Sequence, residues 1–104
     1  MLVSTTFTIK GRRIVETIGL VRGIVVRAPT IPQGIVVGLK RIIGGRIGTY
    51  TDMCEQTRQQ AYDQMIEHAR EMGANAVVGV RYDASEVRAA ATEVLCYGTA
   101  VVVE

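Results

Sequence analysis

The chain has 104 residues, 48% of them hydrophobic, and a formal net charge of +2. This length suits one domain with a single core, and the interspersed acids and bases do not form the clustered basic face of a nucleic-acid-binding protein. No apolar run is long enough for a membrane-spanning helix. We therefore expect one domain, residues 1–104, with no nucleic-acid or membrane partner.

The first part of the chain is strand-like. Residues 3–9 alternate apolar or β-branched with polar side chains, which is typical of a half-buried strand. After a turn, residues 13–27 are again rich in β-branched residues and predict a second, longer strand. Together they predict a β-hairpin. Both prolines fall in residues 28–34, which break regular structure. Residues 35–43 suit a strand or a short helix, and the cations near their end and the glycines that follow favour the helix.

The second part begins with the longest helical pattern, residues 51–72, which Gly73 ends. Residues 75–82 and 92–103 predict two further strands, joined by a loose connection. The order is β-β-(short α)-α-β-β, which indicates an α+β fold with a mainly antiparallel sheet packed on one long helix. The predicted buried stripe of the helix contains Cys54, Ala61, Tyr62, Met65, Ile66, Ala69 and Met72.

The last strand ends in four apolar residues, 100–103, with no charge before Glu104. On the exposed edge of a monomer this run would favour aggregation. The short chain is also rich in β-branched residues and has only five aromatic ones. We therefore expect a homo-oligomer in which the last strand pairs with a neighbouring subunit.

The candidate metal ligands are Cys54, Cys96 and His68, the single histidine. They lack the short Cys/His spacings of structural zinc sites. Cys54 and His68 share roughly one helix face, but a rise of about 1.5 Å per residue separates them by about 21 Å. A ring could gather copies of one residue around its axis. The competing interpretation is that both cysteines simply pack as small hydrophobic residues and that His68 lies on the surface or at a subunit contact. Both thiols are expected to be free, in a cytoplasmic protein, since no signal-peptide pattern precedes the first strand.

A glycine-rich stretch, residues 44–50, precedes the long helix, whose free N–H groups can bind an anion. The stretch lacks the Lys-Ser/Thr pair of a phosphate loop, so a tight connector is the competing interpretation. The candidate ligand-binding residues are Arg41, Arg46 and Tyr50. No nucleophile elbow surrounds any serine, and Glu16 is more readily explained by a pair with an arginine of a neighbouring subunit than by catalysis. We expect the protein not to be an enzyme.

Four segments stand in the order and spacing of a known family: residues 4–6 (STT), 40–46 (KRIIGGR) with Tyr50, 73–80 (GANAVVGV), and 93–101 (EVLCYGTAV). Together they resemble the YbjQ-like family over essentially the whole chain. Residues 28–38 depart from the family pattern, which is more polar and acidic there. The resemblance implies a dodecin-like subunit assembled as a ring, typically a homopentamer, and the label "putative heavy-metal-binding protein", hence a divalent transition metal as cofactor.

We therefore expect first a ring-forming homo-oligomer that binds a metal or a small ligand between subunits. The alternative is a non-catalytic structural or protein-interaction module without a metal, whose loop around Arg46 contacts another protein. An enzyme is the third interpretation, and it needs a convergent polar cluster between subunits.

Overall fold

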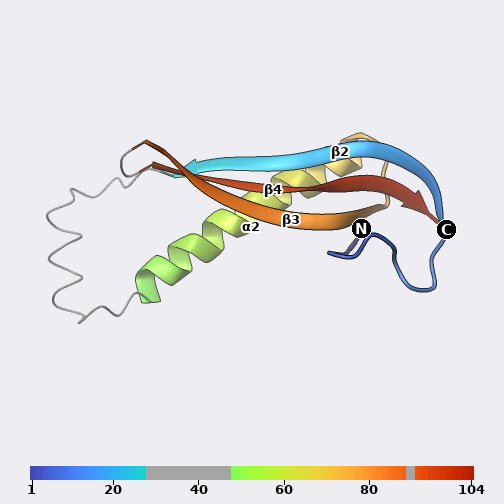
Figure 1. The fold of residues 1–104 in the computed structure, drawn as a ribbon, viewed down its shortest axis with the longest axis horizontal. Coiled ribbons are helices and arrows are strands. Elements are labelled where there is room, and N and C mark those ends of the chain that lie inside the picture. The colour runs from blue at the N-terminus through green and yellow to red at the C-terminus, as the bar shows by residue number, and fades with distance from the viewer. Residues whose placement is uncertain (28–47, 89–90) are drawn as a thin grey trace, which may run out of the picture.

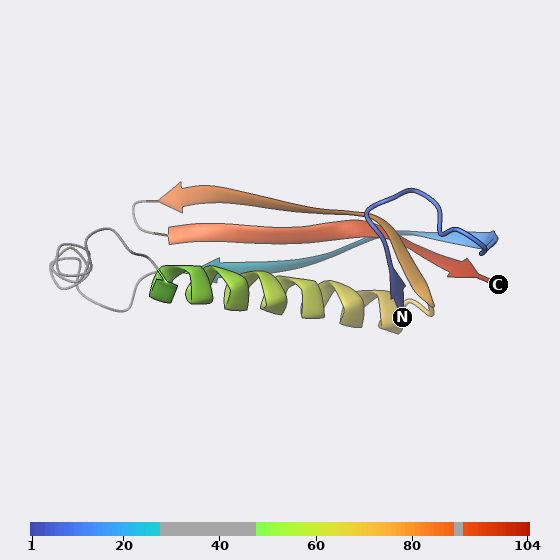
Figure 2. The same ribbon diagram turned by 90° about the horizontal axis from the view of Figure 1, so that it is seen from below.

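The computed structural model describes residues 1–27, 48–88 and 91–104. The predicted short helix at residues 35–43 and the candidate ligand residues Arg41 and Arg46 lie outside the described residues. Within them the elements are β1 (Leu2–Val3), β2 (Ile14–Arg27), α2 (Gly48–Glu71), β3 (Ala76–Arg88) and β4 (Ala91–Val103). Figures 1 and 2 show a sheet with α2 lying along one side of it.

The strands form one mixed sheet in the order β1-β3-β4-β2. The pairs β2–β4 and β3–β4 are antiparallel, and the short pair β1–β3 is parallel. The prediction of an α+β fold with a mainly antiparallel sheet and one long helix is therefore confirmed for the described part of the chain.

The predicted N-terminal hairpin is wrong. The first strand is only two residues long, and it pairs with β3 instead of β2. The hydroxyl groups of the following residues bond to the local backbone: the N–H of Thr6 donates to Ser4 Oγ at 3.1 Å, and Thr6 Oγ1 donates to the carbonyl of Thr8. Such local bonds compete with a strand ladder, and they explain why the alternating pattern folds as a loop.

The loop from Ser4 to Thr8 is held against β3 at Gly79. The N–H of Gly79 donates to the carbonyl of Thr6 at 2.8 Å, and the N–H of Val80 donates to the carbonyl of Ser4 at 3.1 Å. Gly79 has a φ of +63°, which glycine adopts without strain, and the register between β3 and β4 shifts at this point.

The expected place of the last strand at the edge is also wrong. β4 is paired on both sides, by β2 and by β3, so it lies inside the sheet. Its apolar end packs within the same chain, where Val101 and Val103 form a small cluster with Ala76 and Val78. The residues predicted as a loose connection instead extend β3 as far as Arg88, opposite Ala91 of β4.

The helix begins at Gly48, three residues earlier than expected, and buries Ala61, Met65 and Ala69 completely. Cys54 is exposed, contrary to its predicted place in the buried stripe, and Met72 is 38% exposed. Thr57 takes the buried position one turn before Ala61, and it accepts a hydrogen bond from Nε of Arg27, the last residue of β2.

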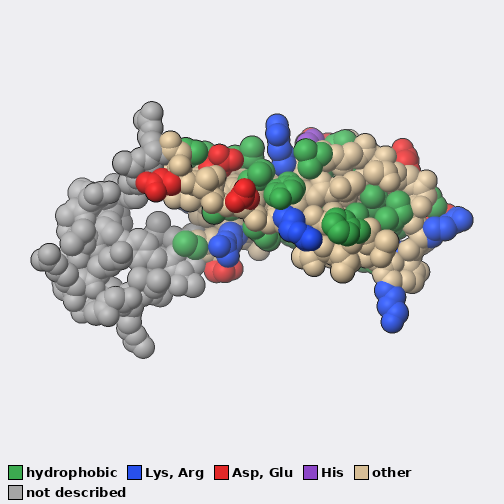
Figure 3. Space-filling view, viewed as in Figure 1, with side chains coloured by type: hydrophobic (Ala, Val, Ile, Leu, Met, Phe, Trp, Pro, Cys, Tyr) green, Lys and Arg blue, Asp and Glu red, His purple; other side chains and the backbone are tan. Residues whose placement is uncertain are grey.

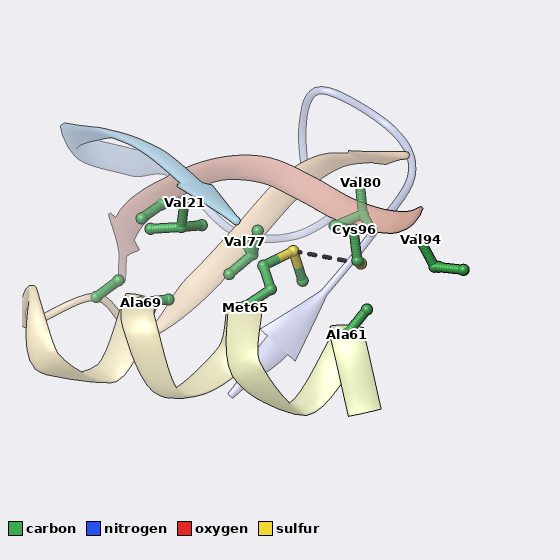
Figure 4. Close-up of a cluster of buried hydrophobic side chains, with 10 residues drawn as sticks. Val21, Ala61, Met65, Ala69, Val77, Val80, Val94 and Cys96 are labelled. Carbon is green, nitrogen blue, oxygen red and sulfur yellow. Dashed lines mark hydrogen bonds between the residues drawn. The ribbon is translucent and has the colours of Figure 1, made fainter. Parts of the chain in front are cut away.

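The main core lies between α2 and the sheet (Figure 4). Close approach of the two layers depends on Gly23: a Cβ at this position would lie 1.9 Å from the carbonyl oxygen of Ala61 and 2.8 Å from the Cβ of Gln64. A glycine inside a strand thus marks the point where the helix backbone crosses it. The labelled core side chains of Figure 4 are Val21, Ala61, Met65, Ala69, Val77, Val80, Val94 and Cys96.

Candidate functional site

Cys96 lies in the core, fully buried between β4 and α2. Its thiol donates a hydrogen bond to Sδ of Met65 at 3.6 Å, as the dashed line in Figure 4 shows. Burial raises the pKa of the Cys96 thiol, and a hydrogen bond with Tyr82 lowers it to a smaller degree. The thiolate is the form that binds metals, so this cysteine is poorly prepared to act as a ligand.

Tyr82 is the polar neighbour of this thiol, on the adjacent strand β3, directly opposite Cys96 in the register. Its pKa is raised, first by burial and then by the nearby Cys96. Met65 was expected in the buried stripe of the helix but not beside a cysteine. The sequence contains no signal for this sulfur pair, because the two residues come from different elements.

His68 lies on α2, and its Nδ1 accepts a hydrogen bond from the backbone N–H of Arg22 at 3.3 Å. A neutral imidazole that accepts through Nδ1 carries its proton on Nε2. In metal sites the arrangement is the opposite, since the ligating nitrogen is free of a proton and the other nitrogen donates. His68 therefore uses Nδ1 to accept a hydrogen bond from the edge of β2, and this nitrogen is not available as a metal ligand.

The three candidate metal ligands do not meet within one chain. Cys54 is exposed near the start of α2, His68 lies near its end, and Cys96 is in the core. In the described ranges no group of three Cys, His, Asp or Glu side chains is placed to hold a metal ion. Tyr50 is in the first turn of α2, whereas its proposed partners Arg41 and Arg46 lie outside the described residues.

A different group of residues meets on the open face of the sheet, the face that points away from α2. Gly23 on β2 and Cys96 on β4 are positions that face α2. Because side chains alternate along a strand, the adjacent residues Arg22 and Tyr97 point to the open face. Tyr97 of β4 is directly opposite Arg22 of β2 and also directly opposite Arg81 of β3. These three residues form one row across three neighbouring strands.

Arg81 is held in place by the N-terminal loop. Its Nη1 donates to the carbonyl oxygens of Thr5 and Val80, each at 2.9 Å. Its guanidinium lies 5.9 Å from the ring centre of Phe7, which is 74% exposed. A Cβ on Gly79 would lie 3.2 Å from the same ring, so Phe7 rests on the bulge of β3.

We call Arg22, Tyr97, Arg81 and Phe7 the arginine–aromatic cluster. The strands lie in front of α2 in the view of Figure 1, and Figure 3 shows basic and hydrophobic side chains next to one another over the middle of this face. Sequence reasoning did not find this cluster. Its only sequence signal is the alternation along each strand, and the register that brings the strands together is not encoded in any one of them.

In the described part of the chain, one helix covers one face of a mixed sheet, and this arrangement defines a two-layer α+β protein. The model of the YbjQ family, described as "Putative heavy-metal-binding", matches residues 1–104, and the chain belongs to this family.

Among its relatives is a UPF0145 protein of Legionella pneumophila, 52% identical over 103 residues, which cover 99% of this chain and 98% of the relative. A UPF0145 protein of Paraburkholderia phymatum is 52% identical over 100 residues, 96% of this chain and 90% of the relative. The fold is similar to the crystal structure of a DUF74-family protein of unknown function from Pediococcus pentosaceus. The TM-score is 0.69 and the identity 18%, over 100% of this chain and 98% of that one.

No helix in the described part of the chain is long and apolar enough to cross a membrane.

Proposed function

We propose that this protein is a homo-oligomer whose subunits join head to tail into a dodecin-like ring, a pentamer by its family resemblance, and that the ring holds a small ligand between subunits. The observation that carries the proposal is the difference between the two edges of the sheet. A contact between two different edges is heterologous, and such contacts form a closed ring when the rotation from one subunit to the next divides a full turn evenly.

The outer edge of β3 is the open one. Among the described residues, β1 pairs only with Ala76 and Val77, and the backbone hydrogen bonds between the N-terminal loop and β3 reach no further than Val80. From Arg81 onward, this edge of β3 has no strand partner among the described residues. Tyr82 and Val87 are 48% and 53% exposed along it. An open strand with exposed apolar residues favours pairing with another chain.

The outer edge of β2 is covered by its own subunit. The N–H groups of Arg22 and Ile24 donate to His68 and Gln64 of α2. Because these N–H groups are already bonded, the occupant that we propose for the β3 edge is a second copy of the chain that packs its β2 and α2 side against the exposed Tyr82 and Val87.

The ligand is not assigned to a metal site within one subunit, because the donor set does not fit one. Cys96 is a buried thiol with a raised pKa, and His68 uses Nδ1 to accept a backbone hydrogen bond. A second candidate is a transition-metal ion shared between subunits, and two observations favour it: the description of the family and the exposure of Cys54. We propose a binding role without catalysis, in the cytoplasm, where both free cysteines stay reduced.

The test is native mass spectrometry of the untagged protein, with and without added zinc, copper and nickel. We expect a ring for the natural chain. Val87→Lys and Tyr82→Lys, which put a charge on the open β3 edge, should break it into smaller species. Thr8→Lys is the matched control, since Thr8 is exposed in the N-terminal loop and belongs neither to the β3 edge nor to the β2 and α2 side.

A monomer at every concentration would overturn the proposal, as would a ring that tolerates both β3 substitutions. Metal bound in a fixed ratio to subunits, and lost in Cys54→Ser, would favour the shared-metal candidate. A ring that is indifferent to all three ions and to small molecules would favour the alternative of a structural or protein-interaction module.

A further inference from the structure

We propose that the arginine–aromatic cluster on the open face binds a nucleoside phosphate. The inference rests on the proposed function only in making this compound the small ligand of the ring. Arg81 is on β3, the strand whose edge the neighbouring subunit is proposed to cover, so the ligand lies beside the subunit contact.

The two arginines supply the phosphate site. Neighbouring strands lie about 4.8 Å apart, so the backbones of Arg22 and Arg81 are about 10 Å apart on either side of Tyr97. The phosphate is placed beside the Arg81 guanidinium, which the carbonyls of Thr5 and Val80 hold, and Arg22 would approach it from β2 across the central strand. Neither arginine makes a salt bridge with the residues that the structure describes. Arg81 is also ordered before any ligand arrives, because two backbone carbonyls hold its Nη1. A guanidinium fixed in this way binds phosphate through its remaining N–H groups at a reduced entropic cost.

The aromatic residues supply the surface for a base. Phe7 is an exposed aromatic ring resting on a glycine, and Tyr97 is partly exposed in the middle of the row. Leu20 and Ile24, two positions to either side of Arg22 on β2, add exposed apolar surface to the same face. A nucleobase stacks on such side chains whichever base it is, because every base has a flat π-face.

The charges along the face favour a free nucleotide over a strand of nucleic acid. Beyond the cluster, the open face continues with Asp83 on β3, which is opposite Leu95 of β4, and then with Glu93 on β4, which is opposite Ser85. These carboxylates would repel a second phosphate. Tight binding of a nucleic-acid strand needs many phosphate contacts, whereas the two arginines of the cluster serve a single phosphate.

The experiment is isothermal titration calorimetry of the natural protein with AMP, adenosine, inorganic phosphate and a short oligoadenylate. AMP should bind more tightly than adenosine or phosphate, since only AMP uses both halves of the site. Arg22→Gln should weaken AMP binding about tenfold, through loss of a hydrogen bond to a charged group. Phe7→Leu and Tyr97→Leu should each weaken it about tenfold through lost stacking. Arg12→Gln, which removes the same charge from an exposed residue at the start of the chain, should leave the affinity unchanged.

Equal affinity for AMP, phosphate and adenosine would overturn the inference, as would equal effects of Arg22→Gln and Arg12→Gln. Tighter binding of the oligoadenylate than of AMP would overturn the assignment to a free nucleotide. Native mass spectra of the same samples separate this inference from the ring. A monomer that binds AMP through Arg22 supports the site and contradicts the ring, whereas a ring that binds no AMP contradicts the site alone.

Discussion

The backbone N–H of Ile24 on β2 donates to Oε1 of Gln64 on α2 at 3.1 Å. Two residues earlier on the strand and four residues later on the helix, the N–H of Arg22 donates to Nδ1 of His68. Two residues of a strand span about 6.6 Å and four residues of a helix span about 6 Å. Successive N–H groups on the edge of β2 are therefore spaced like side chains four residues apart on α2. One face of α2 therefore covers the edge of β2 with side-chain acceptors.

We expect Gln64→Ala to lower the free energy of unfolding by about 1 kcal/mol, since it leaves the N–H of Ile24 without its acceptor. Adding His68→Ala should lower it by about 1 kcal/mol more. Urea denaturation followed by circular dichroism measures both. Gln59→Ala is the control, because its exposed side chain bonds to Asp63 of the same helix. If Gln64→Ala were no more destabilised than this control, the acceptors would not stabilise the strand edge.

The sequence was sufficient for the features that depend on local pattern. The long helix, the strands at β2 and β4 and the α+β class follow from periodicity and from Gly73. Outside the predicted buried stripe, the polar side chains of α2 are exposed at Glu55, Gln59, Asp63, Glu67, Arg70 and Glu71.

Features that depend on pairing were not predictable in the same way. Residues 3–9 have a strand pattern, but hydroxyl groups satisfy the backbone at Thr6, and β1 pairs with β3. The apolar end of β4 indicated an exposed edge, whereas it reflects a strand that is flanked on both sides. The arginine–aromatic cluster exists only because three strands are in one register, which no single segment encodes.

The packing of α2 on β2 also makes Gly23 the most sensitive glycine to test. In Gly23→Ala the new Cβ would meet backbone, the carbonyl of Ala61, and not the end of a flexible side chain. Helix and strand must then move apart, and we expect a loss of about 3 kcal/mol or more in the free energy of unfolding, at the upper end of overpacking effects.

Gly11→Ala is a suitable comparison for this change. Gly11 has a φ of +80° with nothing within 4 Å of an added Cβ, so its substitution costs only backbone strain, about 1 kcal/mol. Thermal unfolding of the two variants measures the difference. Equal midpoints would show that the close crossing at Ala61 does not limit the packing.

Cys96 makes the stability of the fold dependent on alkaline pH. Burial raises the pKa of its thiol above the ordinary value of 9.0, so the folded chain holds this proton more tightly than the unfolded chain does. The resulting stabilisation is complete below the unfolded pKa and is lost as the pH rises from about 9 through the folded pKa. Each site contributes at most about 1.4 kcal/mol per pH unit to this slope. We therefore expect the free energy of unfolding to fall above pH 9 in the natural chain.

Cys96→Val removes the titrating thiol and keeps an apolar side chain in the core, so its stability should fall less steeply above pH 9. Tyr82, whose pKa is also raised, leaves a smaller slope in this variant. Cys54→Ser is the matched control, since it replaces a cysteine that is exposed on α2 and keeps the buried thiol of Cys96. Urea denaturation between pH 8 and pH 10 measures all three proteins. Parallel curves for Cys96→Val and Cys54→Ser would mean that the buried thiol does not set the alkaline limit of the fold.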